Sequence, residues 1–369
     1  MMDALTPLGC GHFATGRDAA GNPVCELCAA ELRAAEFREQ MARADVVKAA
    51  RPPNPTDAAA RPAGAATAAA TTTGATEFAA GVHNMDDPTY FADPLRQFGT
   101  ESLSSTGARH ITPPCTPAHY RWWRDHPADD TSKPMQFGKA VHRLVLGAGA
   151  QLVDAGHDWR DPHDRAVRDQ ALAAGQLPLH TDELDMAGQI ARAVLAHPVA
   201  GPCFAGGAAE QAMFARDPQT GVWLRGRADY LKPLPSGGLL IADLKTTRKL
   251  AAPAEFRREA AEYRYHRQAD WYTMLAELLG LAKAVSVLFV VVETRPPHQV
   301  ACHQIRAGAL TRARHVNRVA IRTFAHCLAV GAWPGYPHVI NQIDLPAWVD
   351  AEEDDILTSQ DLITGDTPC

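Results

Sequence analysis

The sequence has no long apolar run and no excess of positive charge. Nowhere in its 369 residues do about 18 apolar residues follow one another, the length that a membrane-spanning helix needs, so we expect no contact with a membrane. The net charge of −6 argues against a protein that coats nucleic acid through bulk electrostatics, but it is compatible with an enzyme that has a carboxylate metal site. The first residues, MMDALTPLGCGH, lack the basic and apolar segments of a secretory signal, so we expect a cytoplasmic protein.

Composition divides the chain into four parts. Residues 1–44 contain a cysteine and histidine cluster followed by a helical run. Residues 45–80 are almost wholly alanine, proline, threonine and glycine, a composition that cannot form a core and predicts a disordered linker. Residues 81–345 have the variety of a globular domain, and the hydrophobic fraction of 46% suffices for a sizeable core. Residues 346–369 form an acidic segment that we expect to be a loose tail.

Hydrophobic periodicity predicts the order of elements within the globular part. Helical patterns cover residues 116–125, 134–146, 181–197 with Thr181 as the N-cap, 260–280 and 307–330. Apolar runs bounded by turn residues predict strands at 209–216, 221–231, 238–245 and 284–293. Helices, a mainly antiparallel sheet and further helices in this order indicate an α/β or α+β fold.

Two acidic residues and a lysine stand out in the hairpin predicted over residues 222–247. If the hairpin is symmetric about Ser236, Asp229 lies opposite Asp243, and directly opposed residues have Cβ atoms about 5 Å apart. Two carboxylates so close repel each other unless a cation lies between them, and Mg²⁺ prefers such oxygen ligands. Lys245 shares a face with Asp243 because strand side chains alternate.

Two carboxylates and an amine on one face of an otherwise apolar strand suit phosphodiester hydrolysis. A divalent ion polarises the phosphoryl group and lowers the pKa of water, and a lysine positions or activates that water. The alternative is a solvated hairpin with an ordinary salt bridge, because Asp-x-Lys is a common tripeptide.

Five separate parts of the sequence resemble, in this order, the PD-(D/E)xK nucleases. They are Phe137-Gly138-Lys139-Ala140-Val141-His142, then Glu210, Gly226-Arg227-Ala228-Asp229, Asp243-Leu244-Lys245-Thr246-Thr247, and Gln268-Ala269-Asp270-Trp271-Tyr272. More narrowly, residues 100–330 resemble the exonuclease VIII branch of phage-type recombination exonucleases. The resemblance implies a restriction-endonuclease-like core, a central mixed sheet flanked by helices, in a protein encoded by a bacterium or a phage.

The resemblance also implies roles for individual residues. Asp229 and Asp243 would ligate Mg²⁺ or Mn²⁺, with the backbone carbonyl of Leu244 as a further ligand and Lys245 as the catalytic lysine. His142 would lie near the metal, and Glu210 is a looser match that could add a carboxylate. Gln268 and Tyr272 match a helix motif that flanks the catalytic site and the DNA, and they share a face because they are four residues apart. Taken alone, each of His142, Gln268 and Tyr272 would be read as an ordinary core or surface residue.

Basic and hydroxyl side chains near these motifs are the predicted DNA contacts. Ser104 and Ser105 precede an expected helix N-terminus, a ready site for a phosphate. Arg121 and Arg124 alternate with two tryptophans and could bind a DNA backbone and an end base. Arg264 and Arg267, and the stripe Arg314, Arg318 and Arg322, could pair with phosphates. For each group the alternative is a solvated face or, for the tryptophans, the core.

The N-terminal cluster predicts a small zinc-knuckle-like module. Cys10 and His12 form one close pair, and Cys25 and Cys28 form a second pair after twelve residues. Four such ligands suit tetrahedral structural Zn²⁺, and the alternative is a disordered tail with incidental thiols. Cas4-like relatives hold an iron–sulfur cluster through one cysteine before the core and three close together after it. Cys115 falls near the first position, but Cys302, Cys327 and Cys369 are too scattered for the trio, so we expect no such cluster.

The function expected from the resemblance is a 5′→3′ exonuclease on double-stranded DNA ends that leaves 3′ single-stranded overhangs for recombination or repair. It further implies a homo-oligomer and a single-strand annealing protein as partner. The residues alone support only metal-dependent phosphodiester hydrolysis. Two alternatives stay open: a structure-selective or Cas4-like endo- or exonuclease, and a non-catalytic DNA-binding adaptor. Activity on circular DNA separates the first alternative from the expected function, and the intact Asp229, Asp243 and Lys245 argue against the second.

Overall fold

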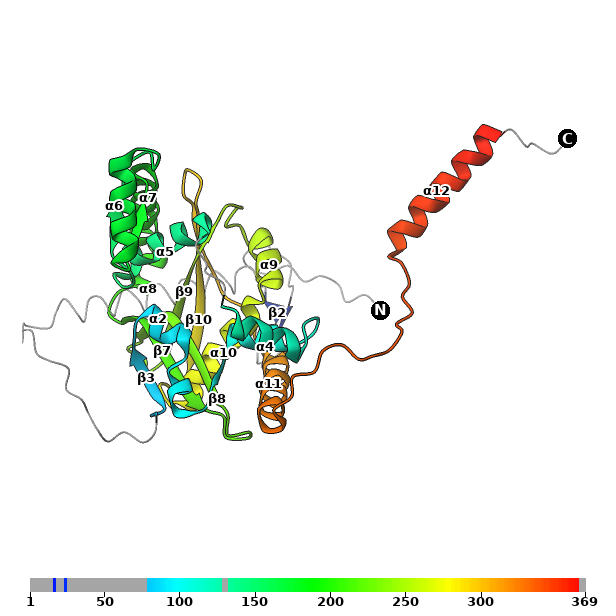
Figure 1. Ribbon diagram of the computed structural model, residues 1–369, viewed down its shortest axis with the longest axis horizontal. Helices are drawn as coiled ribbons and strands as arrows, with labels where there is room; N and C mark the ends of the chain where they lie inside the picture. The colour runs from blue at the N-terminus through cyan, green and yellow to red at the C-terminus, as the bar shows by residue number, and fades with distance from the viewer. Residues whose placement is uncertain (1–15, 18–22, 25–77, 128–131, 365–369) are drawn as a thin grey trace, which may run out of the picture. The chain divides into compact units, whose positions relative to one another are not determined.

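A seven-stranded mixed sheet is the main element of the first of two units, Met1–Trp333 and Pro334–Cys369 (Figure 1). The computed structural model describes residues 16–17, 23–24, 78–127 and 132–364. The strands in spatial order are β11 (Val300–His303), β10 (Val285–Glu293), β9 (Leu239–Thr247), β8 (Trp223–Pro233), β7 (Ala208–Arg216) and β3 (Gly81–Asn84), and β4 (Ser102–Ser104) also pairs with β8. The predicted mixed sheet is confirmed, because β9 with β10 and β4 with β8 are parallel and the other neighbours are antiparallel.

One edge of β8 is shared between two partners. Its first residues, Trp223–Arg225, pair with β4, and its last, Tyr230–Pro233, pair with β9. Between them, residues 226–229 pair with neither of these two described strands, and we call this gap the fork. The fork contains the Gly-Arg-Ala-Asp segment, so the sheet itself opens where the predicted site lies.

Helices cover both faces of the sheet and bury it. Along β9 and β10, odd-numbered apolar residues such as Phe289 join one core cluster, and even-numbered ones such as Val290 join another. Such two-sided burial explains the nearly continuous apolar sequence of these strands. The first cluster includes α3 (Ser105–Ile111), α4 (Pro117–Asp125), α9 (Pro253–Glu262), α10 (Tyr265–Leu278) and α11 (Ala307–Val330); the second includes α5 (Lys133–Leu146), α7 (Thr181–Ala196) and α8 (Ala200–Cys203) (Figure 1).

The helix predicted over residues 260–280 is two helices. α9 ends at Glu262 and α10 begins at Tyr265. Between them Arg264 has φ +62°, a left-handed conformation that non-glycine residues rarely adopt and that cannot continue an α-helix. The prediction failed because the break contains neither glycine nor proline. Its consequence is that Tyr263, Arg264 and Tyr265 form a sharp corner instead of consecutive positions on a helix.

The other predicted elements agree with the structure to within a few residues. α7 begins at Thr181, but its N-cap is His180 rather than the predicted Thr181, whose hydroxyl donates to Asp154 at 2.7 Å. The remaining elements of the first unit are β1 (Gly16–Arg17), β2 (Pro23–Val24), α2 (Asp87–Ala92), a 3₁₀ turn (Pro94–Phe98), β5 (Leu152–Asp154), α6 (Pro162–Ala173) and β6 (Leu177–Leu179).

The boundaries of the globular part shift slightly from the predicted 81–345. Phe78, placed in the linker by composition, packs its ring on Phe214 at 4.9 Å and Trp223 at 5.9 Å between centroids. Residues 45–77 of the predicted linker lie outside the described residues. The acidic tail contains α12 (Ala347–Thr364), a helix where we expected a loose segment. No helix in the described part of the chain is long and apolar enough to cross a membrane.

Candidate active site

Three carboxylates lie in one row across adjacent strands. Continuing the register of each pair by one residue places Glu210 of β7 opposite Asp229 of β8, and Asp229 opposite Asp243 of β9. The β8–β9 hairpin is therefore symmetric about Ser236, as the sequence predicted. Such a row of like charges is destabilising in a sheet unless a cation or a functional demand holds it there.

His142 of α5 joins this row at Asp229. Ligand atoms of His142, Glu210 and Asp229 lie within 4.8 Å of one another, close enough to hold one metal ion. His142 Nε2 lies 2.9 Å from the carbonyl oxygen of Leu244, and that oxygen can only accept a hydrogen bond, so Nε2 carries the proton. The other ring nitrogen, Nδ1, lies 3.7 Å from Asp229 Oδ2. The predicted metal role of the Leu244 carbonyl would need the lone pair that His142 leaves free.

Asp243 is fully buried, and its carboxylate has no hydrogen-bond donor of good geometry in the described structure. Its one charged contact is Lys245, whose Nζ lies 2.6 Å from Oδ1. Burial raises the pKa of Asp243 to about 6, against the pull of the Lys245 ammonium. A buried carboxylate that lacks donors needs a cation to stay ionised, so the residues present fit a divalent metal ion.

Lys245 is a cation that connects the carboxylates to the neighbouring cleft. Burial acts to lower the pKa of Lys245, but the carboxylates of Asp243 and Asp229 outweigh it and raise that pKa above the ordinary lysine value. The side chain also lies over the ring of Tyr265, 4.8 Å from its centroid. A lysine that keeps its proton positions and stabilises negative charge; it does not accept a proton from water.

Glu210 belongs to the site more firmly than its loose sequence match indicated. It has φ +51°, a strained value for a residue with a side chain, in the middle of β7. Arg227 holds it with Nε at 3.1 Å from Oε2 and also pairs with Asp87 at 2.8 Å. Burial and then the Asp229 carboxylate raise the pKa of Glu210 to about 7. The strain and the raised pKa are both typical of a functional position.

Gln268 and Tyr272 act behind the carboxylates and not in contact with them. The Tyr272 hydroxyl accepts from Gln268 Nε2 at 2.9 Å and donates to the Arg227 carbonyl at 2.7 Å. Trp271 Nε1 donates to the Arg225 carbonyl at 2.9 Å. These contacts satisfy backbone groups that the fork leaves without a strand partner. Tyr272 is only 5% exposed, so the catalytic role predicted for it becomes a positioning role.

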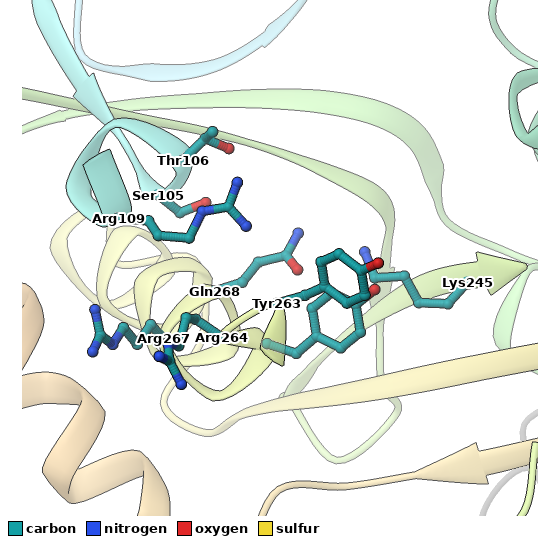
Figure 2. Close-up of a pocket in the computed structure, with 9 residues that line it drawn as sticks. Ser105, Thr106, Arg109, Lys245, Tyr263, Arg264, Arg267 and Gln268 are labelled. Atoms are coloured by element: carbon teal, nitrogen blue, oxygen red, sulfur yellow. The ribbon is translucent and has the colours of Figure 1, made fainter. Parts of the chain in front are cut away.

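A basic cleft of about 210 Å³ adjoins Lys245, and its lining contains four cations and no carboxylate (Figure 2). It is lined by Ser105, Thr106, Arg109, Lys245, Tyr263, Arg264, Tyr265, Arg267 and Gln268. The predicted Ser105, Arg264 and Arg267 are thus brought together beside the site. The sequence interpretation missed Thr106, Arg109, Tyr263 and Tyr265; the spacing of Arg109 one helical turn after Ser105 was a usable signal. Ser104 instead caps α3, accepting from Gly107 N at 3.1 Å.

The arginines of this cleft differ from the other basic residues in having no acidic partner. Among the described residues, Arg109, Arg264 and Arg267 form no ion pair with a carboxylate. Burial and then the neighbouring Arg264 lower the pKa of Arg267, because two like charges crowd each other there. An anion in the cleft would relieve this repulsion.

Arg121 and Arg124 are not the DNA contacts that their sequence predicted. Arg124 is 8% exposed, lies 3.4 Å from the buried Asp93, and donates to carbonyls that follow α2. Arg121 pairs with Glu101 at 2.7 Å and with Asp125. The pattern misled because their acidic partners are distant in sequence or on the opposite side of the helix turn. Trp122, between them, is the exposed residue at 65%.

The basic stripe on α11 is also neutralised internally. Arg314 pairs with Asp270 at 2.6 Å and with Glu277 at 3.0 Å, and Arg318 pairs with Asp217. Arg314 and Arg318 therefore fix α11 to its neighbours, which excludes the phosphate-binding role that their spacing suggested for them. The predicted zinc ligands Cys10, His12, Cys25 and Cys28 lie outside the described residues.

Comparison with known proteins identifies a family for most of this domain. Residues 116–346 match the family described as "PDDEXK-like domain of unknown function (DUF3799)". No curated protein matches the chain. Two similar solved structures are a "Putative exonuclease" from Eubacterium rectale (11% identity, 72% of this chain and 97% of that chain, TM-score 0.49) and a "phage related exonuclease" from Haemophilus somnus 129PT (11%, 63% and 97%, TM-score 0.26). At such TM-scores neither structure contributes to the assignment, which depends on the family match and the geometry of the site.

Proposed function

Because the chain belongs to the family of PDDEXK-like domains, we propose that it is a Mg²⁺- or Mn²⁺-dependent deoxyribonuclease that degrades DNA from an end. The family match confirms the nuclease superfamily predicted from the sequence. One observation supports the activity above all: Glu210, Asp229 and Asp243 converge with Lys245 at the fork, directly beside a cleft that is lined by cations alone.

The carboxylates and His142 would hold the metal. Asp229 and Asp243 offer oxygens, and His142 and Glu210 lie on the other side of Asp229. The chemistry that such an ion supplies is charge stabilisation at the phosphoryl group and a lower pKa for an attacking water. His142 keeps its Nε2 proton on the Leu244 carbonyl, which orients Nδ1 toward the carboxylates.

Lys245 and the cleft arginines would hold the substrate. The Lys245 ammonium reaches both Asp243 and the cleft, so it can neutralise charge on the phosphoryl oxygens as the bond breaks. Arg109, Arg264 and Arg267 offer planar donors without competing carboxylates, which suits the phosphates of the bound strand. The blind end of this arrangement favours a strand terminus over a continuous duplex.

Finer features of the proposal come from the resemblance to the exonuclease VIII branch. They are 5′→3′ polarity on double-stranded DNA, 3′ overhangs that serve recombination or repair, a homo-oligomer, and a single-strand annealing protein as partner. A cytoplasmic location and a structural zinc at Cys10, His12, Cys25 and Cys28 stay proposals of the same kind.

The activity is tested with linear and covalently closed circular duplex DNA, with Mg²⁺ or with EDTA. We expect loss of the linear DNA only, dependent on Mg²⁺ and abolished by Lys245→Ala. The matched control is Lys249→Ala, two turns of the strand end away, whose ammonium lies on the surface 3.8 Å from Glu262. Earlier release of a 5′-terminal label than of a 3′-terminal label would support the polarity.

Two results would overturn parts of the proposal. Degradation of both DNAs would move the assignment to a structure-selective or Cas4-like endonuclease. DNA binding without any degradation, in Mg²⁺ and in Mn²⁺, would favour a non-catalytic adaptor that keeps the carboxylates as a remnant.

A further inference from the structure

Two tyrosines stack on each other at the mouth of the basic cleft, and the activity described above assigns neither a role. The corner between α9 and α10 brings Tyr263 and Tyr265 together with ring centroids 5.7 Å apart and planes 20° apart (Figure 2). Arg264 between them has the left-handed φ of +62°. Such a conformation costs energy in an arginine, so the corner that stacks the rings is maintained at some expense of stability.

The stack is anchored in the core on one side and open on the other. Tyr265 packs on Phe289, which is fully buried, at 5.5 Å and 23°, and on Phe256 at 6.0 Å and 26°. Tyr263 is 48% exposed although its ring lines the cleft. The column therefore presents a rigid aromatic surface at the cleft.

The occupant of that surface follows from the charges around it. Arg109, Arg264 and Arg267 line the same cleft and have no acidic partner among the described residues. A ligand that places a flat apolar ring on Tyr263 and an anion on these arginines has the chemistry of a nucleotide, a base joined to a phosphate. The ammonium of Lys245 lies over Tyr265, so a base on Tyr263 would lie close to the reacting phosphodiester.

We propose that Tyr263 is a specificity-determining residue that stacks on the nucleobase of the terminal nucleotide at the cleft, so that hydrolysis depends on a base being present there. This inference rests on the proposed nuclease function. Because every base has an aromatic face, the contact would hold the strand end without selecting its sequence.

A cycle of two protein variants and two substrates tests the contact. Tyr263→Leu removes the aromatic face and Tyr263→Phe keeps it; the substrates are linear duplexes whose terminal three positions carry either natural nucleotides or single abasic residues. On natural ends we expect Tyr263→Leu to lower kcat/KM by about 5- to 150-fold, and Tyr263→Phe to act as the wild type. On the end with an abasic residue at the stacked position, wild type and Tyr263→Leu should be equally slow.

A purely structural role would reduce activity on natural and abasic ends by the same factor, and this result overturns the proposal. So does an unchanged kcat/KM of Tyr263→Leu on natural ends. Because Tyr263 is half exposed, the melting temperature of each variant should match that of the wild type.

A second readout needs no hydrolysis. DNA ends that carry 5-iodo-2′-deoxyuridine are irradiated with the full-length protein in EDTA, and the cross-linked residue is mapped by mass spectrometry. We expect a cross-link at Tyr263 that Tyr263→Leu abolishes; cross-links at other residues alone would refute the stacking. If the wild type degrades no DNA, the nuclease proposal fails in the first assay, whereas the cross-link still decides where the base binds.

Discussion

Gly226 lies where the catalytic sheet and α10 approach most closely, and Gly226→Ala should destabilise the protein. A Cβ at this position would lie 2.7 Å from Leu275 Cδ1 and 3.1 Å from the Tyr272 ring, and both side chains are buried. Overpacking of this kind costs about 1–3 kcal/mol, partly offset by about 0.5–1 kcal/mol because alanine has less freedom than glycine in the unfolded chain. The net loss of about 0.5–2 kcal/mol corresponds to a melting temperature lower by about 1–8 °C for a domain of this size.

A second motif glycine provides the control with the opposite sign. Gly138 lies inside α5, and its added Cβ would meet only Thr246 Oγ1 at an ordinary 3.5 Å. Gly138→Ala should therefore raise stability by about 0.5–1 kcal/mol through helix propensity. Thermal unfolding followed by circular dichroism compares both variants with the wild type. A Gly226→Ala protein as stable as the wild type would refute the view that this glycine is required for the close approach of Tyr272.

Three further predictions concern charges in and around the site. Arg264→Ala should weaken DNA binding and reduce the slope of log K against log salt by about one, whereas Arg124→Ala should lower the melting temperature and leave that slope unchanged, as measured by fluorescence anisotropy at several salt concentrations. With folded pKa values of about 7 and 6, Glu210 and Asp243 bind more protons in the folded than in the unfolded metal-free protein, so its unfolding free energy should fall as pH rises from about 4 to about 7. Mn²⁺ binds the deprotonated form, so its addition should raise the melting temperature more at about pH 8 than at about pH 5; an equal rise at both would contradict the assignment of these carboxylates. Glu210→Gln should stabilise the metal-free protein at about pH 8, because it removes a repulsion with Asp229, and should weaken Mn²⁺ binding in calorimetry.

The parts of the site that could be predicted from sequence are those that local geometry determines. The β8–β9 hairpin places Asp229 opposite Asp243 because strand alternation and a short turn leave little freedom in the register. The share of Glu210 in the row could not be read in the same way, since the β7–β8 register depends on contacts across the whole sheet. Its left-handed backbone has no sequence signal either.

The basic residues were hard to assign because their roles depend on partners far along the chain. Arg124 looked exposed, yet Asp93 draws it into the core; Arg264 looked like part of a continuous helix, yet it forms the corner of the cleft. Nothing in the immediate sequence distinguishes an arginine that will meet a carboxylate from one that will not. The described structure makes the distinction by the presence or absence of an acidic neighbour.

The fork in the sheet explains why carboxylates, cleft and helix motif occur together. A strand that continued β4 up to β9 would pair with residues 226–229 and close the space in front of Asp229. The open backbone must then be satisfied by other groups. Trp271 and Tyr272 supply hydroxyl and indole donors to the carbonyls of β8, and Asp229 accepts from the Leu244 amide at 2.8 Å. The Gln-x-x-x-Tyr helix is thus needed to keep the sheet open, and the opening is what lets a phosphodiester reach carboxylates that would otherwise be buried between strands.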